Sequence, residues 1–385
     1  MVVYIRTQGA KIVKEGKHLL VKKENTIYHT LFTYKLRQVV IFGNVEITHQ
    51  ALAQLMRNNI DTVFMSYNGR YLGRIAPPES KNVFLHKLQY QRLDDPAFGL
   101  RLARCIVIGK LANMATVLMR IKRTKNDPLP GRNAQEIRNL IGLVEFADHV
   151  NSVRGYEGRG TALYFEAFPC GFVQNMGFTR RVRRPPTDPV NSVLSLLYVF
   201  LMNRVYAAVR LAGLDPYPGF LHSIDYGRHS VVLDLMEEFR TIIVDTLTFS
   251  LFNLKILQKE DFFVEKSHRE ETLDPKADEV PDVTKDPMGL ISVDETDSDI
   301  FDLPEQRIEN GLDVSVAPMG KYPVKLNHDA FKRVIEAFEK KLTTSFYYPP
   351  AGRKLTYSDV LVYQAGHYRK VIEGEAAVYQ PVLLK

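Results

Sequence analysis

A pair of prolines divides this chain into two parts whose apolar residues follow different periodicities. Ala76-Pro-Pro-Glu-Ser80 reads as a linker, because consecutive prolines exclude a helix and favour an extended segment. Before it, short runs of Val, Ile and Leu alternate with turn residues, as in β-strands. After it, apolar residues recur at helical spacing. We therefore predict an α+β protein with a small β domain at 1–75, a linker at 76–81 and a larger all-α domain at 82–385.

The individual elements follow from the same patterns. Strands are predicted at 2–6, 11–14, 18–22, 26–30, 39–42 and 61–66. Thr48 is the expected N-cap of a short helix over 49–57. Longer helices are predicted at 98–123, 131–150, 156–167, 190–211, 329–342 and 356–373, and a further one begins near residue 230.

Charge is spread unevenly along the chain. Residues 270–309 contain 14 acidic and 3 basic residues, whereas the remainder carries 48 basic and 30 acidic ones. A body that basic favours a polyanionic partner, most often nucleic acid, and the acidic stretch is expected to be a mobile insertion. The two cysteines form no CxxC pair and no run of 18 apolar residues occurs, so we expect a cytoplasmic protein without a membrane anchor.

The stretch from Gly219 to Arg240 gathers groups that bind hard metal ions. His222 follows a turn rich in proline and glycine, and the helix after it carries Asp234, Glu237 and Glu238 on one face. Carboxylates with one imidazole suit Mg or Mn. The alternative is an ordinary solvated helix face, and the spacing does not choose between Glu237 and Glu238.

A second segment offers a further carboxylate. Glu157 is placed at the start of a helix and lies between Gly155 and Gly158, which would let another backbone or a nucleic-acid strand approach closely. The simpler interpretation is an acidic first-turn residue favoured by the helix dipole.

Four sequence blocks in fixed order resemble one known family. They are Gly-Tyr-Glu-Gly at 155–158, Pro-Pro-Thr-Asp-Pro-Val-Asn-Ser-Val-Leu at 185–194, Gly-Leu-Asp-Pro-Tyr-Pro-Gly-Phe-Leu-His at 213–222 and Leu-Asp-Leu-Met-Glu-Glu-Phe at 233–239. Together they resemble the CRISPR-associated Cas-one family, the integrase and endonuclease of CRISPR adaptation. The resemblance covers nearly the whole chain, apart from the acidic stretch. It implies a β-sandwich-like N-terminal domain, with the active site on the helical domain.

The resemblance also assigns the catalytic metal ligands. By motif position they are Glu157, His222 and Glu237, holding Mg or Mn. Asp234 matches a nearby acidic position that either orients a ligand or replaces one. The implied reaction is transesterification, in which the 3′-OH of a short prespacer DNA attacks a phosphodiester at a CRISPR repeat border.

The family's assembly is implied in the same way. Expected partners are double-stranded DNA, a second copy of the chain, and a dimer of the Cas-two protein that completes a heterohexamer. Whether a Cas-four processing nuclease is also a partner is left open. Predicted DNA contacts are Arg159, Arg180, Arg181, Arg183, Arg184, Asn191 and Arg240. Asn191 is interpreted more as a positioning residue. Two alternatives remain, a stand-alone metal-dependent nuclease on branched DNA and a catalytically silent DNA-binding protein.

Overall fold

The computed structural model describes residues 1–75, 82–125, 127–182, 185–265 and 322–384. The predicted linker, Arg183, Arg184 and the acidic stretch at 270–309 lie outside these ranges.

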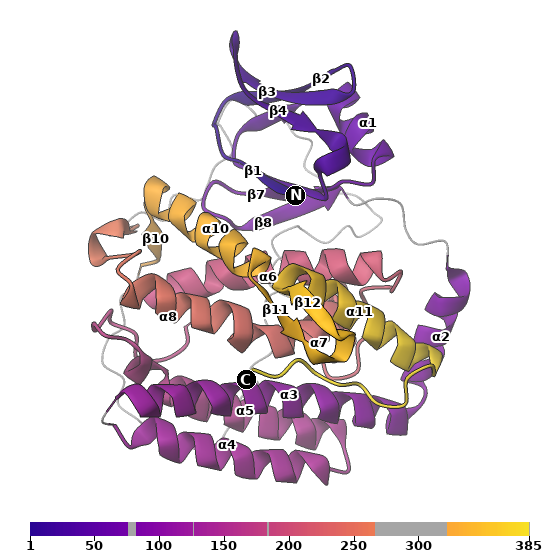
Figure 1. Ribbon diagram of the computed structural model, residues 1–385, viewed down its shortest axis with the longest axis vertical. Helices are drawn as coiled ribbons and strands as arrows, with labels where there is room; N and C mark the ends of the chain where they lie inside the picture. The colour runs from indigo at the N-terminus through magenta and orange to yellow at the C-terminus, as the bar shows by residue number, and fades with distance from the viewer. Residues whose placement is uncertain (76–81, 126, 183–184, 266–321, 385) are drawn as a thin grey trace, which may run out of the picture.

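The N-terminal 75 residues form two sheets and one helix. The strands are β1 (Val2–Ile5), β2 (Ala10–Glu15), β3 (His18–Lys23), β4 (Thr26–Phe32), β5 (Gln38–Phe42), β6 (Val45–Ile47), β7 (Asp61–Met65) and β8 (Tyr71–Ile75). One sheet has the order β1-β5-β7-β8 and the other β4-β3-β2-β6, and each combines parallel with antiparallel pairs. Helix α1 (His49–Arg57) begins where expected, because the Thr48 side chain accepts a hydrogen bond from the backbone of Ala51. The two sheets stack over a shared apolar layer, which makes the part sandwich-like (Figure 1).

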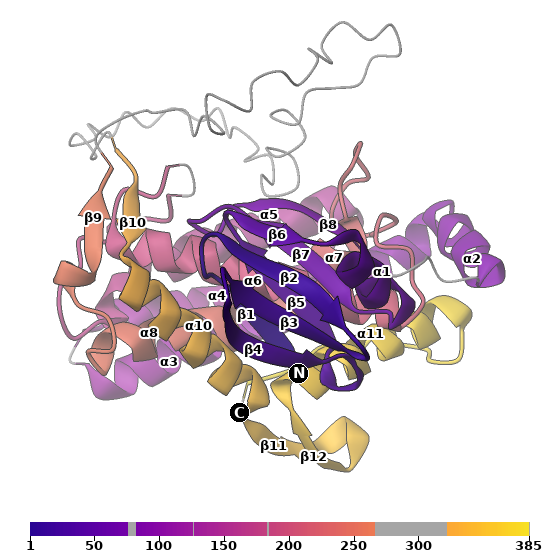
Figure 2. The same cartoon turned by 90° about the horizontal axis from the view of Figure 1, so that it is seen from above.

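Strand β5 shows why the β part is not an independent body. All five of its residues are buried, because each face of the strand meets a different core. Val39 and Ile41 pack between the two sheets, whereas Val40 and Phe42 join the core of the helical part. Seen from above, the sheets lie across the helices (Figure 2).

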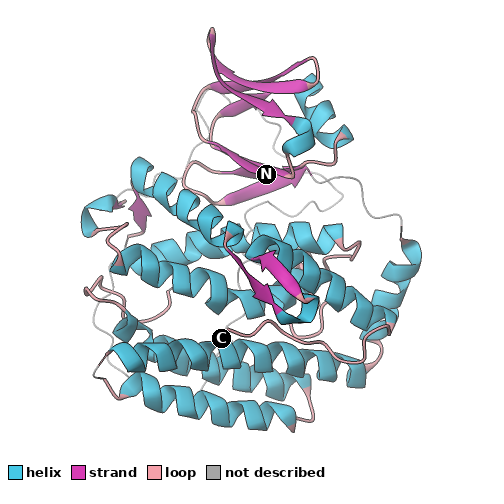
Figure 3. Cartoon of the chain, in the orientation of Figure 1, coloured by secondary structure: helices cyan, strands magenta, loops and turns pink. Residues whose placement is uncertain are grey.

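The described residues after the β part are mainly helical. The helices are α2 (Val83–Leu93), α3 (Pro96–Thr124), α4 (Leu129–Glu145), α5 (Val150–Ala167), α6 (Pro189–Leu211), α7 (Ser230–Phe239), α8 (Thr246–Asn253), α10 (His328–Thr343) and α11 (Tyr357–Glu373). A π-helical turn, Arg240–Asp245, joins α7 to α8. The expectation of an all-α domain is wrong in detail. Two short antiparallel pairs, β9 (Phe262–Val264) with β10 (Val324–Leu326) and β11 (Ser345–Tyr348) with β12 (Arg353–Thr356), flank the helices (Figure 3).

In the part of the chain that the structure describes, two helices are long and apolar enough to cross a membrane by length and composition alone, α3 and α6. Both are core helices here, since 67% and 61% of their most apolar windows are buried inside the protein. Their composition is explained by packing against neighbouring helices on several sides.

Candidate active site

Helix α7 is buried over its whole length, so its acidic residues do not form a solvated face. Asp234, Glu237 and Glu238 are each at most 1% exposed. The helix packs on α3 and α6, and its start lies so close to Gly219 that a Cβ there would come within 2.6 Å of the Ser230 backbone. Buried carboxylates require partners, and each of these three has a different set.

Asp234 organises the loop that carries His222. Its carboxylate accepts hydrogen bonds from the backbone N–H groups of Phe220, Leu221 and His222, at 2.7, 3.0 and 2.9 Å. The Nδ1 atom of His222 lies 2.6 Å from the same carboxylate. A carboxylate cannot donate, so Nδ1 carries the proton in neutral His222 and Nε2 keeps a lone pair. This is the arrangement in which a carboxylate orients a metal-binding imidazole, and it matches the orienting role offered for Asp234.

Glu237 lies where positive groups converge. His222 Nε2 is 3.8 Å from its Oε1, Arg240 Nε donates to Oε1 at 3.0 Å, and Lys110 Nζ is 2.5 Å from Oε2. Burial alone would raise the pKa of Glu237, but Arg240, then Lys110 and His222, outweigh it and bring the pKa to about 2. Glu237 is therefore ionised at neutral pH, as a metal ligand must be.

Glu157 approaches the same point from α5. The prediction that it begins a helix is wrong, because α5 starts at Val150 and Glu157 lies about two turns inside it. Its side chain is 21% exposed and contacts Lys110, and Thr161 donates a hydrogen bond to it at 2.9 Å. A Cβ on Gly155 or Gly158 would meet nothing within 4 Å, so the helix surface beside Glu157 is open.

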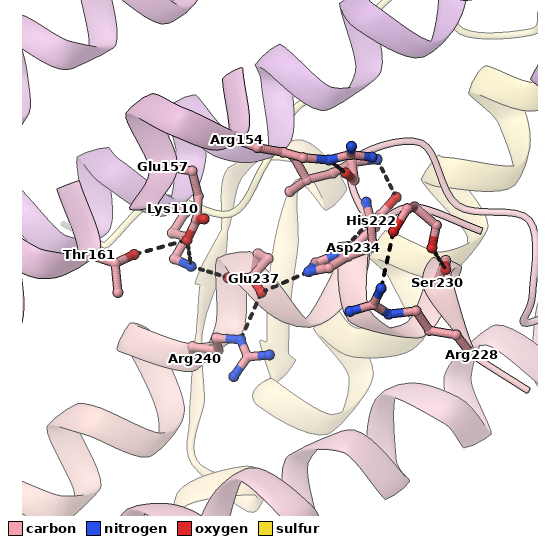
Figure 4. Close-up of polar contacts among 12 residues, drawn as sticks. Lys110, Arg154, Glu157, Thr161, His222, Arg228, Ser230, Asp234, Glu237 and Arg240 are labelled. Atoms are coloured by element: carbon pink, nitrogen blue, oxygen red, sulfur yellow. Dashed lines mark hydrogen bonds and ion pairs between the residues drawn. The ribbon is translucent and has the colours of Figure 1, made fainter. Parts of the chain in front are cut away.

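Lys110 is the site residue that sequence reasoning missed. It comes from the middle of α3, its side chain is 5% exposed, and its ammonium contacts both Glu157 and Glu237 (Figure 4). Burial would lower the pKa of Lys110, but these two carboxylates outweigh that and raise it. The only signal in the sequence is a lysine within the mostly apolar stretch 105–118, and a lone lysine in a long amphipathic helix is usually solvated.

The predicted ligands fit a divalent ion in chemistry, although they are held by other partners here. Within the described ranges, no three His, Cys, Asp or Glu side chains are arranged to hold a metal ion directly. Glu157 and Glu237 nevertheless share one cation, Lys110, and within the described residues the buried Oε2 of Glu237 has no partner besides that ammonium. Two carboxylates and an imidazole with a free Nε2 are a donor set that suits Mg or Mn.

Glu238 turns away from this cluster. It accepts hydrogen bonds from the Tyr379 hydroxyl at 2.6 Å and the Val382 backbone at 2.5 Å, with Gln364 at 3.2 Å. Burial raises its pKa to about 7, which these donors oppose. Glu238 therefore anchors the C-terminal tail, and the geometry favours Glu237 as the ligand.

The predicted DNA contacts differ in how far their side chains are exposed. Arg159 and Arg180 are exposed, whereas Arg240 is engaged with Glu237. Arg181 donates to the side chains of Asn191, at 2.7 Å, and Ser195, at 3.1 Å.

Asn191 is fully buried, so it presents no surface to DNA in this structure. Its carbonyl oxygen accepts from the Val182 backbone, and its amide donates to the Arg180 carbonyl, both at 2.9 Å. It thus positions the arginine-bearing segment on α6.

Comparison with known proteins places this geometry in a family. The sequence matches the family described as CRISPR associated protein Cas1 over residues 3–279. CRISPR-associated endonuclease Cas1 3 of Thermus thermophilus is 28% identical over 388 residues, covering 100% of this chain and 97% of the relative. A CRISPR-associated exonuclease Cas4/endonuclease Cas1 fusion of Geobacter sulfurreducens is 33% identical over 268 residues, 68% of this chain and 48% of the fusion.

Solved structures share the fold at lower identity. A chain of a Cas6-RT-Cas1–Cas2 complex aligns with a TM-score of 0.76 and 22% identity, covering 100% of this chain and 36% of that longer one. A casposase bound to its integration product aligns with a TM-score of 0.75 and 18% identity, covering 98% and 92%. The match to the family over residues 3–279, together with these relatives, shows that this chain belongs to the CRISPR-associated Cas1 family.

Proposed function

We propose that this Cas1-family protein is a divalent-metal-dependent DNA integrase of CRISPR adaptation that acts in the cytoplasm. It would join the 3′-OH ends of a short prespacer duplex to the borders of a CRISPR repeat. The observation that carries the proposal is the convergence of Glu157 and Glu237 on one cation, with His222 Nε2 beside them.

The reaction needs little covalent work from the protein. The prespacer 3′-OH gives its proton to water as its oxygen attacks the repeat phosphorus. The P–O3′ bond of the target breaks with its electron pair leaving on that oxygen, which takes up a proton from water. A Mg or Mn ion held by Glu157, Glu237 and His222 would supply Lewis-acid stabilisation of the charge on the phosphate. One phosphodiester is exchanged for another, so no ATP is required.

The residues around the ligands have separate tasks. Asp234 fixes the orientation and tautomer of His222. Arg240 brings positive charge from the end of α7, where it offsets Glu237 and a phosphate alike. The exposed Arg159 and Arg180 are suited to hold the DNA backbone outside the buried centre.

We also propose that the protein forms a homodimer and assembles with other CRISPR proteins. Strand β4 is an outer strand of its sheet and exposes Ile27 and Tyr28, and Tyr34 follows close by. An apolar sheet edge of this kind favours pairing with a second copy about a two-fold axis. The Cas1–Cas2 complex and the Cas4–Cas1 fusion support Cas2 and Cas4 as partners of this chain as well. We propose in addition that a Cas2 dimer bridges two such dimers in a heterohexamer.

The function is tested by strand joining. A labelled short duplex and a supercoiled repeat plasmid are incubated with the protein across a Mg or Mn series, with a duplex lacking the 3′-OH in parallel. Wild type should join only the duplex with the 3′-OH, and Glu157→Gln and Glu237→Gln should abolish joining. Glu166→Gln, an exposed change on the same helix, is the matched control and should leave joining intact. Strand joining that persists in the presence of a chelator, with no metal added, would contradict the proposal.

A nuclease is the second candidate, because the curated relatives carry the name endonuclease. Water would then replace the 3′-OH as the attacking group at the same residues. Plasmid or branched-DNA cutting that is equal with and without the 3′-OH duplex, and no joined product, would favour the nuclease. DNA binding with neither product would favour a silent binding protein.

A further inference from the structure

The ammonium of Lys110 lies at the centre of the acidic cluster and not at its edge. It contacts Oε1 of Glu157 and lies 2.5 Å from Oε2 of Glu237, two oxygens supplied by α5 and α7. A divalent ion bound at this site would take the same two carboxylate oxygens as ligands. Lys110 and a divalent ion therefore compete for the same two oxygens.

We propose that Lys110 is an internal counter-cation of the active site, which holds Glu157 and Glu237 together until a divalent ion displaces it. The proposal rests on the metal-dependent function above and deepens it. Lys110 is thus a positioning residue, and it also sets how tightly the ion binds.

The charges of the cluster predict that metal binding depends on DNA. Asp234, Glu237 and Glu157 supply three negative charges, and Lys110 and Arg240 supply two positive ones. A divalent ion turns this net −1 into +1 if both cations stay near, so the ion binds weakly until a DNA phosphate arrives. By reciprocity, the ion and DNA then strengthen each other's binding by the same factor.

The lysine is well placed to remain nearby. It projects from the middle of α3, whose buried side chains fix the helix, so only the lysine side chain needs to move. Once released from the carboxylates, a four-carbon stem carries the charge toward a neighbouring phosphate. In this exchange, the Lys110 ammonium leaves its two carboxylate partners and contacts a DNA phosphate instead.

The test uses Lys110→Met, which keeps most of the side-chain volume and removes the charge. Mn²⁺ affinity is measured by calorimetry on the full chain without DNA, and again with a short duplex. Without DNA, we expect Lys110→Met to bind Mn²⁺ at least ~tenfold more tightly than wild type does, a difference of about 1.4 kcal/mol. Adding DNA should then increase the Mn²⁺ affinity of the variant less than that of wild type. Lys122→Met, an exposed lysine about 18 Å along the same helix, should leave both values at wild type.

Thermal melting provides a second readout. Without metal, the Tm of Lys110→Met should be below wild type, because Glu157 and Glu237 then lack their shared cation; saturating Mn²⁺ should close most of this gap. A purely structural lysine would leave the same Tm gap with and without Mn²⁺. Should the single variant fail to fold, Lys110→Met with Glu157→Gln removes one charge of each sign, and its Tm should recover.

The outcomes separate the two proposals. Unchanged or weaker Mn²⁺ binding in Lys110→Met, with wild-type binding that depends on Glu157 and Glu237, would overturn the counter-cation role alone. Wild-type protein that binds no Mn²⁺ through those carboxylates, with or without DNA, would overturn the metal site and the counter-cation together.

Discussion

Changing Asp234 to asparagine should switch the protonated nitrogen of His222 without removing any ligand. Asp234 now accepts from the ring Nδ1 of His222 and from three backbone N–H groups. Asparagine has a single side-chain oxygen, which can still accept from the backbone N–H groups of Phe220 and Leu221. Its NH₂ group then faces His222. The ring can satisfy that group only by accepting at Nδ1, which moves the proton to Nε2 and removes the lone pair needed for a cation.

The size of the effect follows from the bonds affected. The backbone N–H of His222 is left without an acceptor, which costs about 1–3 kcal/mol in a buried site. The two bonds that remain lose their charge assistance, about 1 kcal/mol each. The loss of stability should therefore be about 4 kcal/mol. Metal affinity and joining rate should each fall about 10–100-fold, as for other lost carboxylate partners of a ligating histidine.

Calorimetry with Mn²⁺, the joining assay and thermal melting are measured on the same preparations. Asp225→Asn is the control, because Asp225 is an exposed acid in the same loop and its replacement should change none of the three. A variant with lower Tm but wild-type Mn²⁺ affinity and joining would refute the tautomer argument and leave Asp234 a purely structural residue.

Three other changes test separate parts of the structure. Gly219→Ala should destabilise the protein by about 1–3 kcal/mol in melting experiments, because its Cβ would lie 2.6 Å from Ser230 at the start of α7; an unchanged Tm would mean that α7 shifts freely. Burial lowers the pKa of His229 from 6.5 to about 4, so its contribution of about 3 kcal/mol is present above pH 6.5 and lost as the pH falls toward 4. Its replacement by phenylalanine should therefore reduce the drop in Tm between pH 7 and pH 4, and equal drops would contradict this. Arg159→Ala with Arg180→Ala should flatten the log–log salt dependence of DNA affinity by about one unit per lost contact, and an unchanged slope would assign both arginines another role.

Much of the fold is legible in the sequence because local signals and burial agree. Short β-branched runs gave strands close to their observed bounds, and Thr48 caps α1 as expected. The predicted start of α5 at residue 156 is wrong: the helix begins at Val150 and runs through the glycines at 155, 158 and 160, which disfavour a helix. Tertiary packing overrides that weak preference, since Gly160 lies against Leu111 of α3 so closely that a Cβ there would come within 2.3 Å of its side chain.

The site was only partly predictable for a related reason. Spacing put Asp234 and Glu237 on one helix face, but whether that face meets water depends on what packs over it. The family resemblance supplied Glu157, far away in sequence. Lys110 had no such signal, because a lysine on an amphipathic helix is recognised as a site residue only when the opposing carboxylates are in view.

Three acids within two turns of α7 show how burial assigns different roles to similar side chains. The partners of Asp234 are backbone N–H groups and an imidazole, so it is held rigidly and acts through His222. Glu238 is bound by neutral donors of the C-terminal part, and among the described residues no cation is paired with it. Glu237 alone of the three is compensated by cations on long side chains, Lys110 and Arg240. A cation on a flexible stem can be replaced by another cation at small structural cost, whereas a backbone N–H cannot. This difference in partners, more than the position of the carboxylate in the sequence, makes Glu237 the residue that can exchange an internal charge for a metal ion.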